Sequence, residues 1–226
     1  MFFLNIIILM NDDILKNANN LYREGKYEEA LNEYLKIEKR NPYLYYNIGN
    51  SYYRLGKKGL ALLYYKKAFY LNPRDRDIRN NIEIIEGKRR FENPIAGFFY
   101  SFLTSFSLNE AFLIFILLYG IGCILLTIFF IKRLQSLLIT SILFIILSFV
   151  FIPNILYWIT RINSNECVII ENTSGRSGPG ENFQEIVEFQ EGLSGKVLKR
   201  DDGWYLFSSG EEIGWINGGL KFIIEK

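Results

Sequence analysis

The stretch LYREGKYEEALNEYLKIEKRNP at residues 21–42 reappears 31 residues later as YYRLGKKGLALLYYKKAFYLNP at residues 52–73. Ten of the 22 aligned positions are identical. The matched pairs include Gly25/Gly56, Ala30/Ala61, Leu31/Leu62, Tyr34/Tyr65 and Pro42/Pro73, with Asn19/Asn50 just upstream. Self-similarity at a fixed period indicates that one supersecondary unit is stacked on the next.

Each copy has the residue spacing of two packed α-helices. Apolar and small residues recur at helical spacing on one face, as at Tyr45, Ile48, Gly49 and Tyr52. Gly25 and Gly56 are expected to end the first helix of each pair. The small residues expected to let the second helix pack closely are Ala30, Ala61 and Ala68. The Asn-Pro pairs at 41–42 and 72–73 are expected to stop the second helix.

At these positions the sequence resembles the tetratricopeptide repeat family. A third amphipathic helix follows, with Ile78, Ile82 and Ile85 as its apolar stripe and a charged outer face typical of a capping helix. Residues 11–92 are therefore predicted to form an all-α solenoid of two repeats plus a cap. Because about three repeats are usually needed for stability, we expect this solenoid to dock on the membrane, on itself or on a partner.

The resemblance places a peptide-binding groove on the first helices of the pairs. The candidate groove residues are Leu15, Asn19, Tyr22, Tyr46, Asn50 and Tyr53. Asparagine amides can hydrogen-bond an extended peptide, and tyrosine offers contact area at low entropic cost. The alternative for Tyr22 and Tyr53 is that they fill space between helices.

Two uncharged runs follow, over residues 111–131 and 134–160. A bilayer core is crossed by about 20 apolar helical residues, so the sequence predicts a transmembrane hairpin. Gly120 and Gly122 allow close helix approach, and Pro153 is expected to kink the second span or mark its end. The aromatic-rich linker at 93–110 is too short to span and is expected to lie at the lipid surface.

Charge leaves the orientation of the hairpin open. Lys132 and Arg133 favour a cytoplasmic tip and extracytoplasmic soluble parts, whereas Arg161 and the basic run at 88–90 favour the reverse. Residues 1–10, MFFLNIIILM, are either part of a signal-peptide core or an apolar start to the first helix.

Residues 165–226 change to strand-like segments separated by glycine turns. Five short strands predict a small β-barrel, and the tail resembles the bacterial SH3-type domain. The residues that carry this resemblance are Arg176, Ser177, Gly178, Pro179, Trp204, Tyr205, Gly214 and Trp215. Trp204 and Trp215 are expected in the core and rim of the barrel, with a ligand platform as the alternative. Cys167 is expected to be a small buried residue.

Composition excludes several classes of site. The chain has no histidine and only two cysteines, which excludes Ser-His-Asp and Cys-His catalysis, histidine-ligated zinc and four-thiolate metal sites. The net charge of +2 gives no case for nucleic-acid binding. Paired carboxylates such as those at 201–202 fall at predicted turns. We predict no catalytic residue, metal or cofactor.

The domain order is similar to the BatE-type membrane proteins of bacterial aerotolerance operons. This resemblance implies a scaffold without enzymatic activity in the bacterial cytoplasmic membrane, with its soluble domains on the extracytoplasmic side. It also implies membrane partners bearing von Willebrand factor A domains and a nearby MoxR-type ATPase. The alternative function is an envelope sensor whose SH3-type tail binds peptidoglycan.

The two soluble parts have opposite net charges. Residues 11–94 carry 17 basic and 12 acidic side chains, and residues 162–226 carry 6 basic and 11 acidic ones. We therefore expect that they can dock on each other and close the groove.

Overall fold

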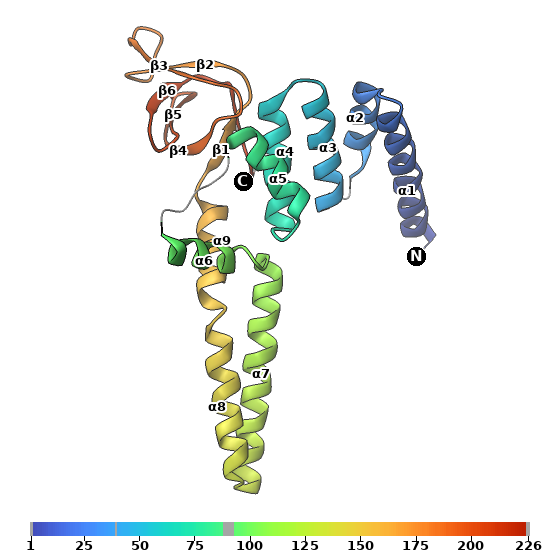
Figure 1. Cartoon of the computed structure of the whole chain (residues 1–226), viewed down its shortest axis with the longest axis vertical. Helices are drawn as coiled ribbons and strands as arrows, with labels where there is room; N and C mark the ends of the chain where they lie inside the picture. The colour runs from blue at the N-terminus through green and yellow to red at the C-terminus, as the bar shows by residue number, and fades with distance from the viewer. Residues whose placement is uncertain (1, 39, 88–92, 225–226) are drawn as a thin grey trace. The chain divides into compact units, whose positions relative to one another are not determined.

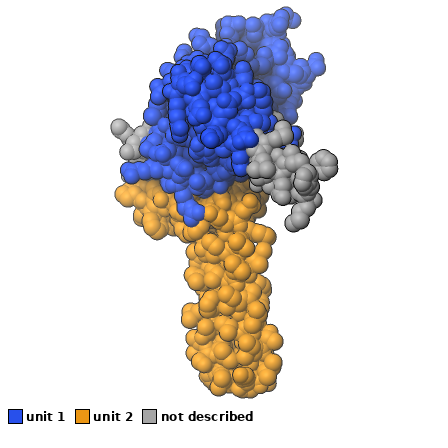
Figure 2. Space-filling view, turned by 90° about the vertical axis from the view of Figure 1, so that its right-hand side faces the viewer, with its two compact units in different colours: residues 1–89, 164–226 blue, residues 90–163 orange. Residues whose placement is uncertain are grey.

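The computed structural model describes residues 2–38, 40–87 and 93–224, with side chains from Asp12 onward. The chain divides into two compact units. Unit 1 combines Met1–Arg89 with Ser164–Lys226, and unit 2 is Arg90–Asn163 (Figure 2). The β-rich tail therefore belongs to the same unit as the helical repeats, although about 75 residues separate them in sequence.

Unit 1 begins with five helices in which each packs on the next (Figure 1). They are α1 (Phe2–Arg23), α2 (Tyr27–Lys36), α3 (Pro42–Arg54), α4 (Lys58–Leu71) and α5 (Arg76–Glu86). Gly25 and Gly56 follow α1 and α3 with φ of 79° and 78°, a left-handed conformation that a side chain would strain. The predicted helix pairs are confirmed, and α1 includes the apolar segment that begins at Phe2.

Small residues set how closely the paired helices approach. Ala30, Ala61 and Ala68 are fully buried. Gly49 in α3 faces the Tyr65 ring of α4, and a Cβ there would lie 2.6 Å from that ring. The buried core of the first repeat comprises Ala18, Ala30, Leu31, Tyr34, Ile37, Leu44 and Ile48.

One predicted helix boundary is wrong. Helix α2 ends at Lys36, and Asn41-Pro42 begins α3 instead of stopping the helix before it. The Asn41 side chain accepts a hydrogen bond of 2.8 Å from Leu44 N. Pro42 occupies the first helical turn, where its missing N–H leaves no hydrogen bond unmade. At the second pair, Asn72 follows the end of α4 as predicted.

Unit 2 is helical throughout its main elements. It contains α6 (Pro94–Leu103), α7 (Leu108–Lys132), α8 (Gln135–Phe149) and α9 (Ile152–Asn163). Two segments of the described chain, Leu108–Lys132 and Gln135–Asn163, are helical, long enough and apolar enough to cross a membrane. The second segment is interrupted between α8 and α9. Pro153, which was expected to kink the second span or mark its end, lies just after this interruption in the first turn of α9.

Close packing between α7 and α8 depends on one glycine. A Cβ at Gly122 would meet Ile145 Cγ1 at 2.7 Å and the Ser141 carbonyl oxygen at 3.1 Å, whereas a Cβ at Gly120 would meet nothing within 4 Å. Ser141 is fully buried at this contact. Of the two glycines that were predicted to allow close helix approach, Gly122 is the one that lies against α8.

We predict that Gly122→Val destabilises the hairpin by about 1–3 kcal/mol, because overpacking pushes the two helices apart. Gly120→Val is the matched control and should change stability far less, since it faces open space. Unfolding of the purified chain in detergent, followed by circular dichroism, measures both variants. Equal loss in the two would contradict the packing described here.

Hydrogen bonds join α9 to the C-terminal end of α6. The last carbonyls of a helix have no intrahelical partner, and here two side chains of α9 donate hydrogen bonds to carbonyls at the end of α6 and just after it. Asn154 Nδ2 donates to Leu103 O at 2.8 Å, and Trp158 Nε1 donates to Phe106 O at 2.7 Å. Both side chains are buried, so the short helix and the end of the second span form one structure.

The tail is an antiparallel sheet of seven strands, ordered β3-β2-β6-β5-β4-β1-β7. Its strands are β1 (Glu166–Ile169), β2 (Thr173–Arg176), β3 (Glu185–Phe189), β4 (Ser194–Asp201), β5 (Trp204–Ser208), β6 (Ile213–Ile216) and β7 (Leu220–Phe222). Five strands in a closed barrel were predicted, and both points need correction. The short strands β2 and β7 were not predicted, and the ladder among the described residues ends at β3 and β7 without closing.

The sheet encloses its own apolar core. Its buried members are Cys167, Ile169, Phe189, Val197, Phe207 and Ile216. Phe189 and Phe207 meet edge to face, with ring centroids 4.8 Å apart. Cys167 is fully buried, as predicted, and its Sγ lies 3.8 Å from Gly195 O. Burial raises the pKa of this thiol to about 12, which keeps it protonated and unreactive.

Candidate binding groove of the helical repeats

A pocket of about 320 Å³ opens on the helical repeats. It is lined by Tyr22, Tyr46, Asn50, Tyr53, Arg54, Tyr65, Asn81 and Ile84. These residues come from α1, α3, α4 and α5, so the pocket extends from the end of the first helix of the first repeat across the second repeat to the cap. Four of the six groove candidates, Tyr22, Tyr46, Asn50 and Tyr53, are brought together here.

The other two candidates lie outside this pocket. Leu15 packs against the buried core of the first repeat. Asn19 holds that repeat to the next, since its Oδ1 accepts from Tyr34 OH at 2.7 Å and from Asn47 Nδ2 at 3.3 Å.

Asn50 repeats this arrangement one unit later. Its Oδ1 accepts from Tyr65 OH at 2.8 Å and from Asn81 Nδ2 at 3.1 Å. Each of these two asparagine oxygens therefore accepts from a tyrosine of its own repeat and from an amide in the first helix of the following unit. The atom of Asn50 that is left for a ligand is Nδ2, which is a donor.

The rest of the pocket wall also favours donors. Arg54 has five N–H donors and no acceptor. Hydrogen bonding to Tyr22 raises the pKa of Arg54 above its usual value, and the Tyr27 ring lies 5.9 Å from its guanidinium. The hydroxyls of Tyr22, Tyr46 and Tyr53 can donate as well. The lining contains no carboxylate, so the pocket suits a ligand rich in acceptors, such as peptide carbonyls or carboxylates.

Sequence reasoning missed four of the lining residues: Arg54, Tyr65, Asn81 and Ile84. The signal for Asn81 was present in the repeat itself. Asn19, Asn50 and Asn81 are spaced by 31 residues, the period of the whole repeat. Helix α5 therefore occupies the position of the first helix of a third unit.

The tail candidates have structural partners within the sheet. Arg176 ends β2, donates to Glu181 O and Phe183 O, and pairs with Glu185 at 2.9 Å. A Cβ at Gly178 would lie 2.4 Å from the Phe183 ring. These contacts fix the loop that contains Ser177 and Pro179.

The aromatic candidates of the tail lie on neighbouring strands. Trp204 and Tyr205 begin β5, Gly214 and Trp215 lie in β6, and Trp215 pairs with Arg176 of β2. Trp215 is 9% exposed. The Lys199 ammonium lies 5.6 Å from its ring, and the Arg200 guanidinium 5.8 Å from that of Tyr205. Cations from β4 thus lie over both aromatic rings.

Comparison with known proteins identifies the repeats. Residues 18–56 match the TPR repeat family, and residues 42–75 match the tetratricopeptide repeat family. No curated protein and no solved structure matches the chain. The two matches together cover residues 18–75, so this segment contains tetratricopeptide repeats, which indicate a scaffold for protein–protein interaction. Within the described residues, no three acidic or cysteine side chains are grouped to hold a metal ion.

We predict that Tyr34→Phe and Tyr65→Phe each lower the free energy of unfolding by about 1 kcal/mol, because each removes one buried hydrogen bond to an asparagine. Tyr43→Phe is the control, since Tyr43 is 52% exposed. Urea titrations of the three variants measure the effect. A Tyr65→Phe chain as stable as the control would show that the asparagine contact contributes nothing.

Proposed function

We propose that this protein is a membrane-anchored scaffold without enzymatic activity, and that it holds a segment of a partner protein in the groove of its repeats. The supporting observation is the pocket lined by Asn50, whose Oδ1 is occupied by hydrogen bonds from Tyr65 and Asn81, so that its Nδ2 donor is the atom left for a ligand. Fixing a donor before the ligand arrives lowers the entropic cost of binding.

The partner segment that suits this pocket is extended and rich in acceptors. Its backbone carbonyls meet Asn50 Nδ2, and an acidic side chain meets the Arg54 guanidinium. Tyr22, Tyr46 and Tyr53 then supply apolar contact area that needs little ordering. A tetratricopeptide groove binds by contacts spread along a segment, so moderate affinity is expected.

The anchor is the helical hairpin of α7 and α8–α9. Phe112, Leu113 and Ile116 are examples of the large apolar side chains that it exposes, and lipid is the solvent that covers such a surface without cost. The BatE-type resemblance extends the proposal to the bacterial cytoplasmic membrane, with the soluble unit on the extracytoplasmic side. It also extends it to partners bearing von Willebrand factor A domains and a MoxR-type ATPase system.

The test of the groove is photo-crosslinking in native membranes. A photoreactive amino acid at Ile84, inside the pocket and 63% exposed, is compared with one at Tyr43, which is 52% exposed and outside the pocket lining. We expect a discrete protein adduct from position 84 alone. No adduct, or the same adducts from both positions, would contradict the scaffold proposal. Retention of the full chain by purified peptidoglycan would favour the sensor function instead.

Helix α6 extends the proposed anchor along the lipid surface. Ile95, Phe98 and Phe99 are all more than half exposed, and the helix carries no charge from Pro94 to Leu103. Its hydrogen-bonded link to α9 holds these side chains beside the end of the second span. A helix in that position lies in the membrane interface.

We predict that an environment-sensitive fluorophore at Phe98→Cys reports a shallow lipid position in vesicles. The labelling background is Cys123→Ser, because Cys167 is buried with a pKa of about 12 and stays unlabelled. Matched labels at Ile124→Cys and Asp202→Cys mark deep and aqueous positions. We expect emission at 98 to shift to the blue and to be quenched most by lipids with a quencher near the headgroup.

The three labels separate two ways of failing. If position 98 behaves like position 202 while 124 is lipid-exposed, α6 does not contact the membrane. If position 124 also behaves like position 202, the hairpin is not inserted and the anchor itself is wrong.

A further inference from the structure

Strand β1 is buried on both faces, and its outer face packs on the repeats. Cys167 and Ile169 point into the core of the sheet, while Val168 joins a second buried cluster. That cluster comprises Leu62 and Leu63 of α4 together with Val168 and Ile223 of the tail. Residues packed around it include Ile82 and Ile85 of α5. The sheet thus meets α4 and α5 through an apolar contact.

A glutamate of the tail also caps a repeat helix. Helix α4 has Lys57 at its N-cap position, which makes no side-chain cap hydrogen bond. Glu191, in the turn after β3, accepts from Gly59 N in the first turn of α4 at 2.8 Å. A carboxylate at this position satisfies an orphan N–H and complements the helix dipole. Tyr70 OH adds a second hydrogen bond across the contact, to Glu166 Oε2 at 2.9 Å.

Gly59 is required for this close approach. A Cβ at residue 59 would lie 2.4 Å from Ile169 O and 2.7 Å from Ile170 Cα, both backbone atoms of the tail. No flexible side chain can move aside to make room, so the sheet itself would have to shift.

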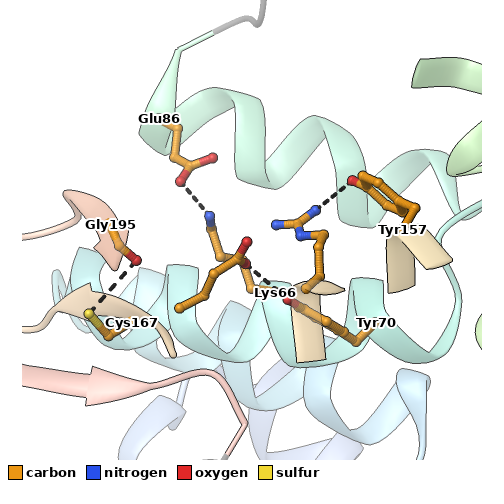
Figure 3. A network of polar contacts seen from close by, with 8 residues as sticks. Lys66, Tyr70, Glu86, Tyr157, Cys167 and Gly195 are labelled. Atoms are coloured by element: carbon orange, nitrogen blue, oxygen red, sulfur yellow. Dashed lines mark hydrogen bonds and ion pairs between the residues drawn. The ribbon is translucent and has the colours of Figure 1, made fainter. Parts of the chain in front are cut away.

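Helix α5 connects this contact to the groove. Asn81 and Ile84 line the pocket, and Asn81 Nδ2 donates to Asn50 Oδ1. On an adjacent face of the same helix, Ile82 and Ile85 pack against the shared cluster, and a Cβ at Gly192 of the tail would lie 3.2 Å from Ile85 Cγ2. Lys66 of α4 pairs with Glu86 at the end of the same helix, 2.7 Å away (Figure 3). The helix is held between the groove and the sheet.

We propose that the sheet positions one wall of the groove, although it does not line the groove itself. It takes the place of the next repeat in the stack, and Glu191, Gly59 and Val168 are positioning residues that hold α5, and with it Asn81 and Ile84, against the ligand site. The two soluble parts are in contact, as expected, but the contact described above is made by apolar residues and hydrogen bonds, whereas docking was expected from opposite net charges. The expected closure of the groove is not seen, since the pocket is lined by helical residues alone. The functional consequence rests on the groove function proposed above.

Gly59→Ala tests the proposal through the sign of its effect. If the sheet is not docked, alanine in place of glycine strengthens α4, because alanine is the better helix former. If it is docked, the new Cβ collides with the backbone of β1 and releases the sheet. Lys58→Ala, one residue earlier and exposed, is the matched control.

The measurement is hydrogen exchange, read by mass spectrometry, on the full chain in lipid nanodiscs. In Gly59→Ala we expect amides of β1 and α5 to exchange faster by about tenfold or more, with α1 and α2 unchanged. Lys58→Ala should match the unaltered chain. Slower exchange in α4 of Gly59→Ala, with α5 unchanged, would overturn the proposal.

A second pair of variants isolates the cap. Glu191→Ala removes the acceptor for Gly59 N, whereas Glu191→Gln keeps a carbonyl oxygen at the same place. We expect faster exchange of α5 in Glu191→Ala and substantial rescue in Glu191→Gln. Equal exchange in all three chains would show that the carboxylate does not position α5. Because neither measurement uses a ligand, failure here is distinguishable from failure of the groove to bind a partner.

Discussion

The two-sided burial of β1 is the constraint on which the soluble unit depends. A sheet in water normally covers one face and wets the other, but residues 167–169 are buried without alternation. One face of the strand completes the core of the sheet, and the other covers apolar residues of α4 and α5. Two tetratricopeptide repeats and one further helix leave apolar residues of α4 and α5 without a helical neighbour. Val168 and Ile223 of the tail bury these residues.

The groove depends on side-chain hydrogen bonds that connect successive repeats. Asn19 and Asn50 each accept hydrogen bonds from a tyrosine of their own repeat and from an amide in the first helix of the following unit. These bonds join successive units, and those of Asn50 are made by residues that line the pocket. They occupy the amide oxygen of Asn50 and leave its Nδ2 donor for a ligand. The proposed preference for acceptor-rich segments therefore follows from the way in which the repeats are connected.

In unit 2, the corresponding constraint is that the backbone carbonyls at the end of the short helix α6 need hydrogen-bond donors. Orphan carbonyls are costly wherever water is scarce, and Asn154 and Trp158 serve those around the end of α6. Gly122 lets α7 and α8 approach, and a capping box at Ser107 and Glu110 begins α7. All of these contacts lie within unit 2.

The sequence by itself determined the helical repeats, the apolar hairpin and the strand-rich tail, because periodicity and uninterrupted apolar runs are local properties of the chain. The sequence also contains two patterns that were not used in the predictions. One is Asn81 at the repeat period, and the other is the unalternating run at 167–170, typical of a strand covered on both faces. Only the tertiary structure decided which surface covers β1, why Gly59 has no side chain, and which groove candidates meet in one pocket. Those answers depend on contacts such as Gly59–Glu191, whose two residues are 132 positions apart. No pattern along the chain records such a contact, because it arises only when the folded parts pack together.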